Sequence, residues 1–186
     1  MDNRSKDFSS VRTYEYVHGT CESALAGASF SSRSIEPAKL RQILEAGLIA
    51  PTAVNYQPQK IYVLQSEEAL KTIRAITRST YNAPTVLLVC YDNRLSWKSP
   101  FVEGYDCGEM DATIVCTHMM LEAWDIGVGS CWVLLFDPAE VKRAFNLPEY
   151  IVPVCLLPIG YAAPNAKPYA PWHNTFRSLD ETVKVL

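Results

Sequence analysis

Apolar residues recur along this chain with two different periods. Between residues 36 and 50 they return every three or four positions behind Pro37, which predicts an amphipathic helix with proline in its first turn. Residues 85–91 instead form an unbroken run of β-branched and leucine side chains, which is typical of a buried strand. The alternation of such segments predicts an α/β or α+β layer fold.

Capping residues place the remaining elements. Ser66 stands ahead of two glutamates and predicts a helix N-terminus, and Asp137 followed by Pro138 predicts another. Short strands are expected at 60–64 and 151–161, the second bent at its prolines. A proline-containing loop is expected at 162–177.

The longest apolar segment, residues 106–125, would carry apolar side chains on nearly every face of a helix. Such a helix is covered by protein on most sides, so we expect it in the centre of the fold or at a subunit interface. A break at 126–130 follows, and the apolar run Cys131–Phe136 predicts one more strand.

Composition narrows the class of protein. A chain of 186 residues suits one domain, or one protomer of an intertwined dimer, and 48% hydrophobic with 20% charged residues is ordinary for a globular protein. The net charge of -3 provides no basic field, which argues against nucleic acid and anionic membranes as partners. No apolar run approaches the ~20 residues that span a bilayer, so we expect a soluble cytoplasmic protein.

The six cysteines include no Cys-x-x-Cys pair, and several lie in apolar runs, which favours buried, reduced thiols. Cys116 and His118 are two positions apart, so on a helix they face different directions and a shared metal would be hard to build. We therefore expect no metal site.

The most distinctive polar segment is the stretch 50–59. Pro51 and Pro58 fix their own φ and disfavour helix in the residue before them, so the preceding helix gives way to an extended loop. Polar side chains on this loop either reach a ligand or form ordinary turns with their own backbone, and these two interpretations stay open. The side chains concerned are Thr52, Asn55 and Gln57.

Three blocks together, Pro51–Pro58, Asp111–Val133 and Leu157–Tyr161, resemble the nitroreductase family of FMN-dependent oxidoreductases. They occur in the family's order and spacing, which is more specific than any one motif. The resemblance implies one FMN-binding domain over residues 30–186, behind a divergent or poorly ordered segment 1–29. It also implies an α+β fold: a mixed, mainly antiparallel sheet flanked by helices, in an intertwined homodimer.

The resemblance further implies that Thr52, Asn55 and Gln57 meet the flavin, with Asn55 at the pyrimidine edge of the ring. That edge alternates hydrogen-bond acceptors and donors, and an amide side chain carries both. By the same resemblance the strand containing Trp132 lies along the ring. Backbone amides near Leu134 and Leu135 then approach its reactive nitrogen. The alternative, that this segment is only a buried strand, also fits the sequence.

For the FMN phosphate the resemblance points to Arg177, although an arginine at that place is equally explained as a solvated side chain. The family's Arg-x-Ser-x-Arg segment is missing from residues 22–30. Losing two charge-assisted contacts of about 1.5–3 kcal/mol each would weaken binding by several powers of ten. Arg12, Arg33 and Arg177 are the candidates to replace them. A diverged N-terminus and a shifted reading frame both explain the difference.

No Ser-His-Asp, Cys-His or paired-carboxylate arrangement stands out, so no protein nucleophile is expected and FMN would carry the redox chemistry. The resemblance implies hydride transfer from NAD(P)H, by a ping-pong mechanism, to a nitroaromatic, quinone or related acceptor. The alternative is a family relic that binds flavin weakly or not at all and acts as a binding or interaction protein.

Overall fold

The computed structural model describes residues 29–164, 166 and 176–186, so all but the last residue of the predicted divergent segment 1–29 lies outside the described residues. The helices are α2 (Pro37–Leu48), α3 (Glu67–Ile76), α4 (Gly108–Asp125), α5 (Pro138–Ala144) and α7 (Leu179–Thr182). The strands are β1 (Gln59–Leu64), β2 (Thr85–Asp92), β3 (Gly129–Ser130) and β4 (Ile151–Gly160). Two 3-10 turns are η1 (Ala53–Asn55) and η2 (Arg78–Thr80).

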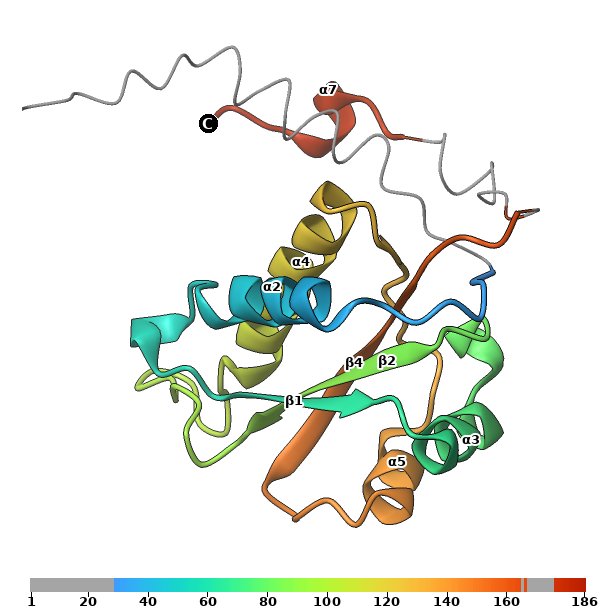
Figure 1. Ribbon diagram of the computed structural model, residues 1–186. Helices are drawn as coiled ribbons and strands as arrows, with labels where there is room; N and C mark the ends of the chain where they lie inside the picture. The colour runs from blue at the N-terminus through green and yellow to red at the C-terminus, as the bar shows by residue number, and fades with distance from the viewer. Residues whose placement is uncertain (1–28, 165, 167–175) are drawn as a thin grey trace, which may run out of the picture.

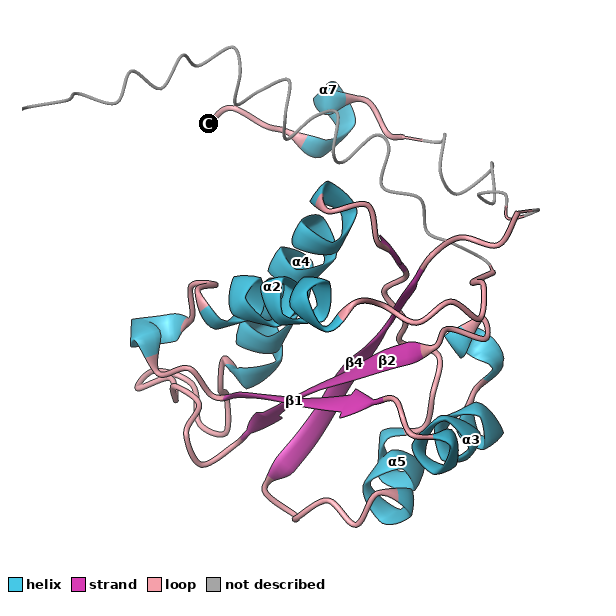
Figure 2. Ribbon diagram, viewed as in Figure 1, coloured by secondary structure: helices cyan, strands magenta, loops and turns pink. Residues whose placement is uncertain are grey.

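The strands form one sheet in the order β1-β2-β4-β3, and every neighbouring pair is antiparallel (Figure 2). This confirms the predicted α+β fold with a mainly antiparallel sheet. Strand β4 contains a bulge, because Val89 pairs with Cys155 whereas the next residue, Cys90, pairs with Pro153. The extra residue leaves Val154 unmatched and breaks the ladder beside a proline, which itself has no N–H to donate.

Helices cover both faces of the sheet (Figure 1). Successive side chains of β2 point to opposite faces, so Leu87 and Val89 pack with α2 and α4, whereas Val86 and Leu88 pack with α3 and α5. Because both faces of β2 are covered, its sequence has no polar alternation, as the apolar run at 85–91 predicted.

Local capping signals are confirmed at the helix starts. Ser66 accepts a hydrogen bond from the amide of Ala69, and Asp137 accepts from the amides of Ala139 and Glu140. These bonds satisfy amides that have no partner inside the helix. Of the helices in the described ranges, none is long and apolar enough to cross a membrane.

Helix α4 differs from its prediction in two respects. It begins at Gly108 rather than at residue 106, because the Asp106 carboxylate accepts a hydrogen bond from the Gly108 amide and ends the preceding turn. It is also covered on fewer sides than expected, since Met110 and Ile114 are 48% and 38% exposed. An apolar composition indicates that a helix face is suited to burial, but not whether its own chain or another chain covers it.

The start of α2 is tied to the end of β4. The hydroxyl of Tyr161 donates to Glu36, whose carboxylate also pairs with Arg33 at 2.6 Å. The Arg33 guanidinium in turn stacks on the Tyr161 ring, 4.1 Å from its centroid. These contacts lower the pKa of Glu36 to about 2, with the Tyr161 hydrogen bond as the largest cause.

Replacing Gly108 by alanine is expected to destabilise the fold. A Cβ there would lie 2.1 Å from two ring carbons of Tyr91, and this ring packs against the core of α2 and α4. Overpacking of this kind costs about 1–3 kcal/mol of unfolding free energy, to be measured by urea denaturation. The control is Glu109→Ala at the neighbouring exposed position, and equal stability of the two variants would contradict the prediction.

Tyr161→Phe is expected to raise the pKa of Glu36 from about 2 towards its ordinary value of 4.5. Because the pKa is lower in the folded chain, ionised Glu36 stabilises the fold above pH 4.5, and this contribution is lost as pH falls through about 2. The variant should therefore lose part of its resistance to acid. NMR titration of the Glu36 carboxyl carbon measures the shift. Tyr62→Phe, on the other face of the sheet, should leave it unchanged.

Candidate functional site

The loop between α2 and β1 has an unusual backbone. Val54, Asn55 and Gln57 have φ values of 52°, 56° and 50°, in the left-handed region that favours glycine. Asparagine tolerates this region, but a β-branched valine is a genuine outlier there. Such residues cost about 1–3 kcal/mol each and persist only where surrounding contacts hold them, most often at binding and catalytic sites.

Two of the hydrogen bonds that hold this loop in place are accepted by side chains. The Gln57 amide donates to the hydroxyl oxygen of Thr52 at 3.0 Å, across the turn itself. The Ala53 amide donates to Oδ1 of Asp111 at 2.8 Å, which anchors the loop to the first turn of α4. Thr52 therefore supports the loop from within, which agrees with the interpretation of its side chain as an ordinary turn former.

Asp111 was not among the predicted site residues. Its side chain is 2% exposed, and its second oxygen, Oδ2, is buried without a hydrogen-bond partner in the described residues. The sequence does carry one signal for Asp111, because it is an acidic residue among the apolar positions of a helix. Its importance depends on Ala53, which is 58 residues away in the sequence.

The loop presents polar and apolar groups to the outside. Asn55, Tyr56 and Gln57 are exposed, as is the strained Val54. A hollow of about 260 Å³ lies beside the loop, between α2 and β1. Gln59 is part of its lining, and the buried Oε1 of this residue has no hydrogen-bond partner among the described residues. The residues lining this hollow are Leu44, Leu48, Gln57, Gln59 and Ile61.

The second predicted group departs from expectation, because residues 131–136 do not form a strand. Strand β3 ends at Ser130. Beyond it, the Cys131 amide donates to the Pro158 carbonyl at 3.1 Å and an isolated bridge joins Val133 to Leu156. The Phe136 amide then donates to the Leu134 carbonyl in a tight turn. The Thr77 hydroxyl also binds the Leu135 carbonyl at 2.6 Å, which draws the chain towards the end of α3.

As a result, Leu134 and Leu135 are 59% and 76% exposed, and Trp132 is also exposed. This excludes the alternative that the segment is only a buried strand. An apolar run indicates a strong tendency to leave water, but it does not distinguish a core strand from an apolar surface that awaits a ligand or a partner.

The structure does not bring the two predicted groups together within one chain. The loop with Asn55 leads into β1, whereas Trp132 follows β3, and these are the two edge strands of the sheet (Figure 1). Three strand spacings, about 14 Å in total, separate the two edge strands. The loop is also anchored to α4 on one face, whereas Leu135 is held by Thr77, next to α3 on the other.

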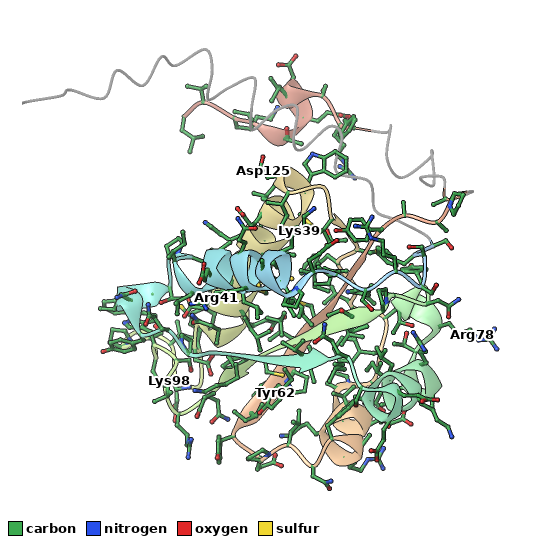
Figure 3. All side chains as sticks on the ribbon, viewed as in Figure 1. Lys39, Arg41, Tyr62, Arg78, Lys98 and Asp125 are labelled. Atoms are coloured by element: carbon green, nitrogen blue, oxygen red, sulfur yellow. The ribbon has the colours of Figure 1, made fainter. Side chains whose placement is uncertain are left out.

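The cations considered for the phosphate differ in their surroundings. Arg33 is already paired with Glu36 and stacked on Tyr161. Arg177 is exposed immediately before α7, and Arg12 lies outside the described residues. A further cation, Lys39, donates to the Ile126 carbonyl at 2.6 Å, close to the end of α4 that carries Asp125 (Figure 3). Of the two candidates within the described residues, Arg33 is thus already engaged by Glu36 and Tyr161, whereas Arg177 is exposed.

The described cysteines are neither bridged nor grouped as metal ligands. Burial raises the pKa of the Cys90 thiol to about 12, which keeps it protonated. Over the described ranges, no three His, Cys, Asp or Glu side chains gather as metal ligands would. The cysteines in those ranges are free thiols, namely Cys90, Cys107, Cys116, Cys131 and Cys155.

Comparison with known proteins agrees with this architecture. A solved structure of a nitroreductase family protein from Clostridium difficile 630 superposes with a TM-score of 0.82 and 32% identity, covering 89% of this chain and 95% of that one. A protein of Bacillus subtilis named FMN reductase [NAD(P)H] is 27% identical over 152 residues, 73% of this chain and 61% of its own length. An NADPH-dependent oxidoreductase of Staphylococcus aureus is 22% identical over 184 residues, 87% of this chain and 72% of its own.

The sequence pattern that defines the nitroreductase family matches residues 29–82 and 75–161. These ranges contain the anchored loop, α4, the exposed segment after β3, and β4. The chain therefore belongs to the nitroreductase family.

Proposed function

We propose that this chain is an oxidoreductase that binds FMN and uses NAD(P)H as its hydride donor. The loop at 52–57 carries the proposal, because it holds strained residues in place and presents amide side chains beside a hollow. The names of the Bacillus subtilis and Staphylococcus aureus relatives, an FMN reductase and an NADPH-dependent oxidoreductase, support the choice of cofactor and donor.

The chemistry of the exposed groups fits FMN. Asn55 and Gln57 offer both donors and acceptors, as the pyrimidine edge of a flavin requires. The exposed Trp132, Leu134 and Leu135 offer apolar surface to the ring, and the backbone amides near the two leucines are the groups proposed to approach its reactive nitrogen.

In the same proposal Arg177 binds the phosphate through its guanidinium. When bound, FMN supplies the electron-transfer chemistry, and the chain's own residues bind and orient it and control access.

The finer proposal concerns the acceptor and the order of events. Both the donor and a flat acceptor, such as a nitroaromatic or a quinone, would have to approach the same ring. A single site that serves both in turn gives ping-pong kinetics. The position of a hollow lined by leucine and isoleucine side chains next to the loop is compatible with an acceptor that is largely apolar.

Purified protein is expected to retain FMN absorbance after excess FMN is removed. In the presence of a quinone or nitroaromatic, it should then oxidise NAD(P)H faster than the same concentration of free FMN does. Asn55→Ala should weaken FMN binding about tenfold, which is 1.4 kcal/mol. Asn146→Ala is the matched control, because Asn146 is also an exposed asparagine with positive φ, 50°, at the end of α5.

Equal FMN affinity of the two asparagine variants would remove Asn55 from the site. A colourless protein that ignores added FMN would contradict the proposed function. It would favour the alternative of a family relic that acts as a binding protein.

We further propose a homodimer in which each site combines the loop of one copy with the segment 132–135 of the other. The separation of these groups at opposite edges of the sheet supports this arrangement. Exposed apolar side chains on the outer face of α4 and in residues 176–186 provide surface for a partner. These are Met110, Ile114, Phe176, Leu179, Val183, Val185 and Leu186.

The dimer proposal predicts complementation between two defective variants. Asn55→Ala alters the loop, and Leu135→Asp places a charge on the exposed segment at the other edge of the sheet. Subunit exchange between them gives heterodimers in which one site carries both changes and the other neither. FMN titration of the mixture should reveal a fraction of sites with wild-type affinity. Simple averaging of the two variants, or a monomer by sedimentation, would contradict the proposal.

A further inference from the structure

Asp111 has a buried carboxylate with only one hydrogen-bond partner. The side chain is 2% exposed, Oδ1 accepts from the Ala53 amide at 2.8 Å, and Oδ2 has no partner in the described residues. A half-satisfied buried charge normally opposes folding, because removal from water costs more than one hydrogen bond returns. Its presence in the first turn of α4 therefore calls for a role other than packing.

The helix lowers this cost only in part. Asp111 lies near the N-terminus of α4, where the helix dipole favours negative charge. An apolar residue of similar size would nevertheless suit the surroundings better, since the neighbouring buried positions of the helix are Ala112 and Val115. The one bond that the carboxylate does form is directed at the strained loop, and the amide it binds belongs to the residue just before Val54.

We propose that Asp111 is a positioning residue for the FMN site, an inference that rests on the proposed function. By holding the Ala53 amide, its carboxylate keeps Val54 and Asn55 in their left-handed conformation before any cofactor arrives. Without this bond, Val54 would relax to the negative φ that a β-branched residue prefers. Binding FMN would then have to order the loop again, and a preorganised loop avoids that cost.

A purely structural role is the competing explanation, and Asp92 offers a matched control for it. Asp92 is likewise a carboxylate that is 2% exposed and accepts a backbone hydrogen bond, from Arg94 at 3.0 Å. Its side chain bonds stay within the turn after β2, where it also pairs with the Arg94 guanidinium at 2.6 Å. Removing either carboxylate leaves a backbone amide without its acceptor, so global stability is measured for both variants, but only Asp111→Ala should alter the loop.

The experiment compares wild type, Asp111→Ala, Asp111→Asn and Asp92→Ala by two measurements. The first is the FMN dissociation constant of the folded protein, by titration. The second is hydrogen exchange of the Ala53 amide in the protein freed of cofactor. Asp111→Ala should weaken FMN binding at least tenfold and speed exchange at Ala53 at least tenfold. Asp92→Ala should change neither by more than about twofold once its global stability is taken into account.

Asp111→Asn should recover most of the FMN affinity, to within about threefold of wild type, because its amide oxygen still accepts from Ala53. The inference is overturned if the Asp111→Ala and Asp92→Ala variants have the same FMN dissociation constant and the same exchange rate at the Ala53 amide. If wild type binds no FMN, the proposed function fails, and the exchange measurement still decides whether Asp111 holds the loop.

Discussion

The burial of β2 on both faces is the constraint on which the rest of this structure depends. Its alternating side chains require an apolar cover above and below the sheet, which α2 and α4 provide on one side and α3 and α5 on the other. Fixing α4 over the sheet places its first turn beside the end of α2. The anchored loop exists because these two helices meet there, with the Ala53 amide and Asp111 at hydrogen-bond distance.

The candidate site is therefore supported by rigid elements, although the residues proposed to face the ligand are on loops. Strained backbone at Val54 is stabilised by a carboxylate on a helix, and the segment at Leu135 is fixed by the hydroxyl of Thr77 next to α3. In both cases a bond from a packed element holds an exposed segment that has little packing of its own. This is the arrangement expected where precise geometry matters more than local stability.

The chain exposes several large apolar side chains that its own fold leaves uncovered. Leu134 and Leu135, the outer face of α4, and the terminal residues 176–186 all leave large apolar side chains in water. Exposed apolar surface of this kind is what the proposed homodimer and flavin site would cover. The same surface explains why the apolar run at 131–136 resembled a core strand.

Much of the fold could be predicted from the sequence, because its signals are local. Pro37, Ser66 and Asp137 mark helix starts through bonds or φ values that involve neighbouring residues, and the run at 85–91 marks a strand buried on both sides. The family resemblance likewise depends on residue identities in order, and the family match confirms it. The two prolines also located the loop after α2, whereas contact of its polar side chains with a ligand stays a prediction.

Only the tertiary structure decided how these parts act together. The anchoring of Ala53 by Asp111 joins positions 58 residues apart, and the bond between Tyr161 and Glu36 joins positions 125 apart. The exposure of Leu134 and Leu135, and the positive φ of Val54, also depend on contacts from other elements. No local pattern encodes such pairs, because capping and periodicity act over a few residues, whereas these contacts form only when packing brings distant segments together.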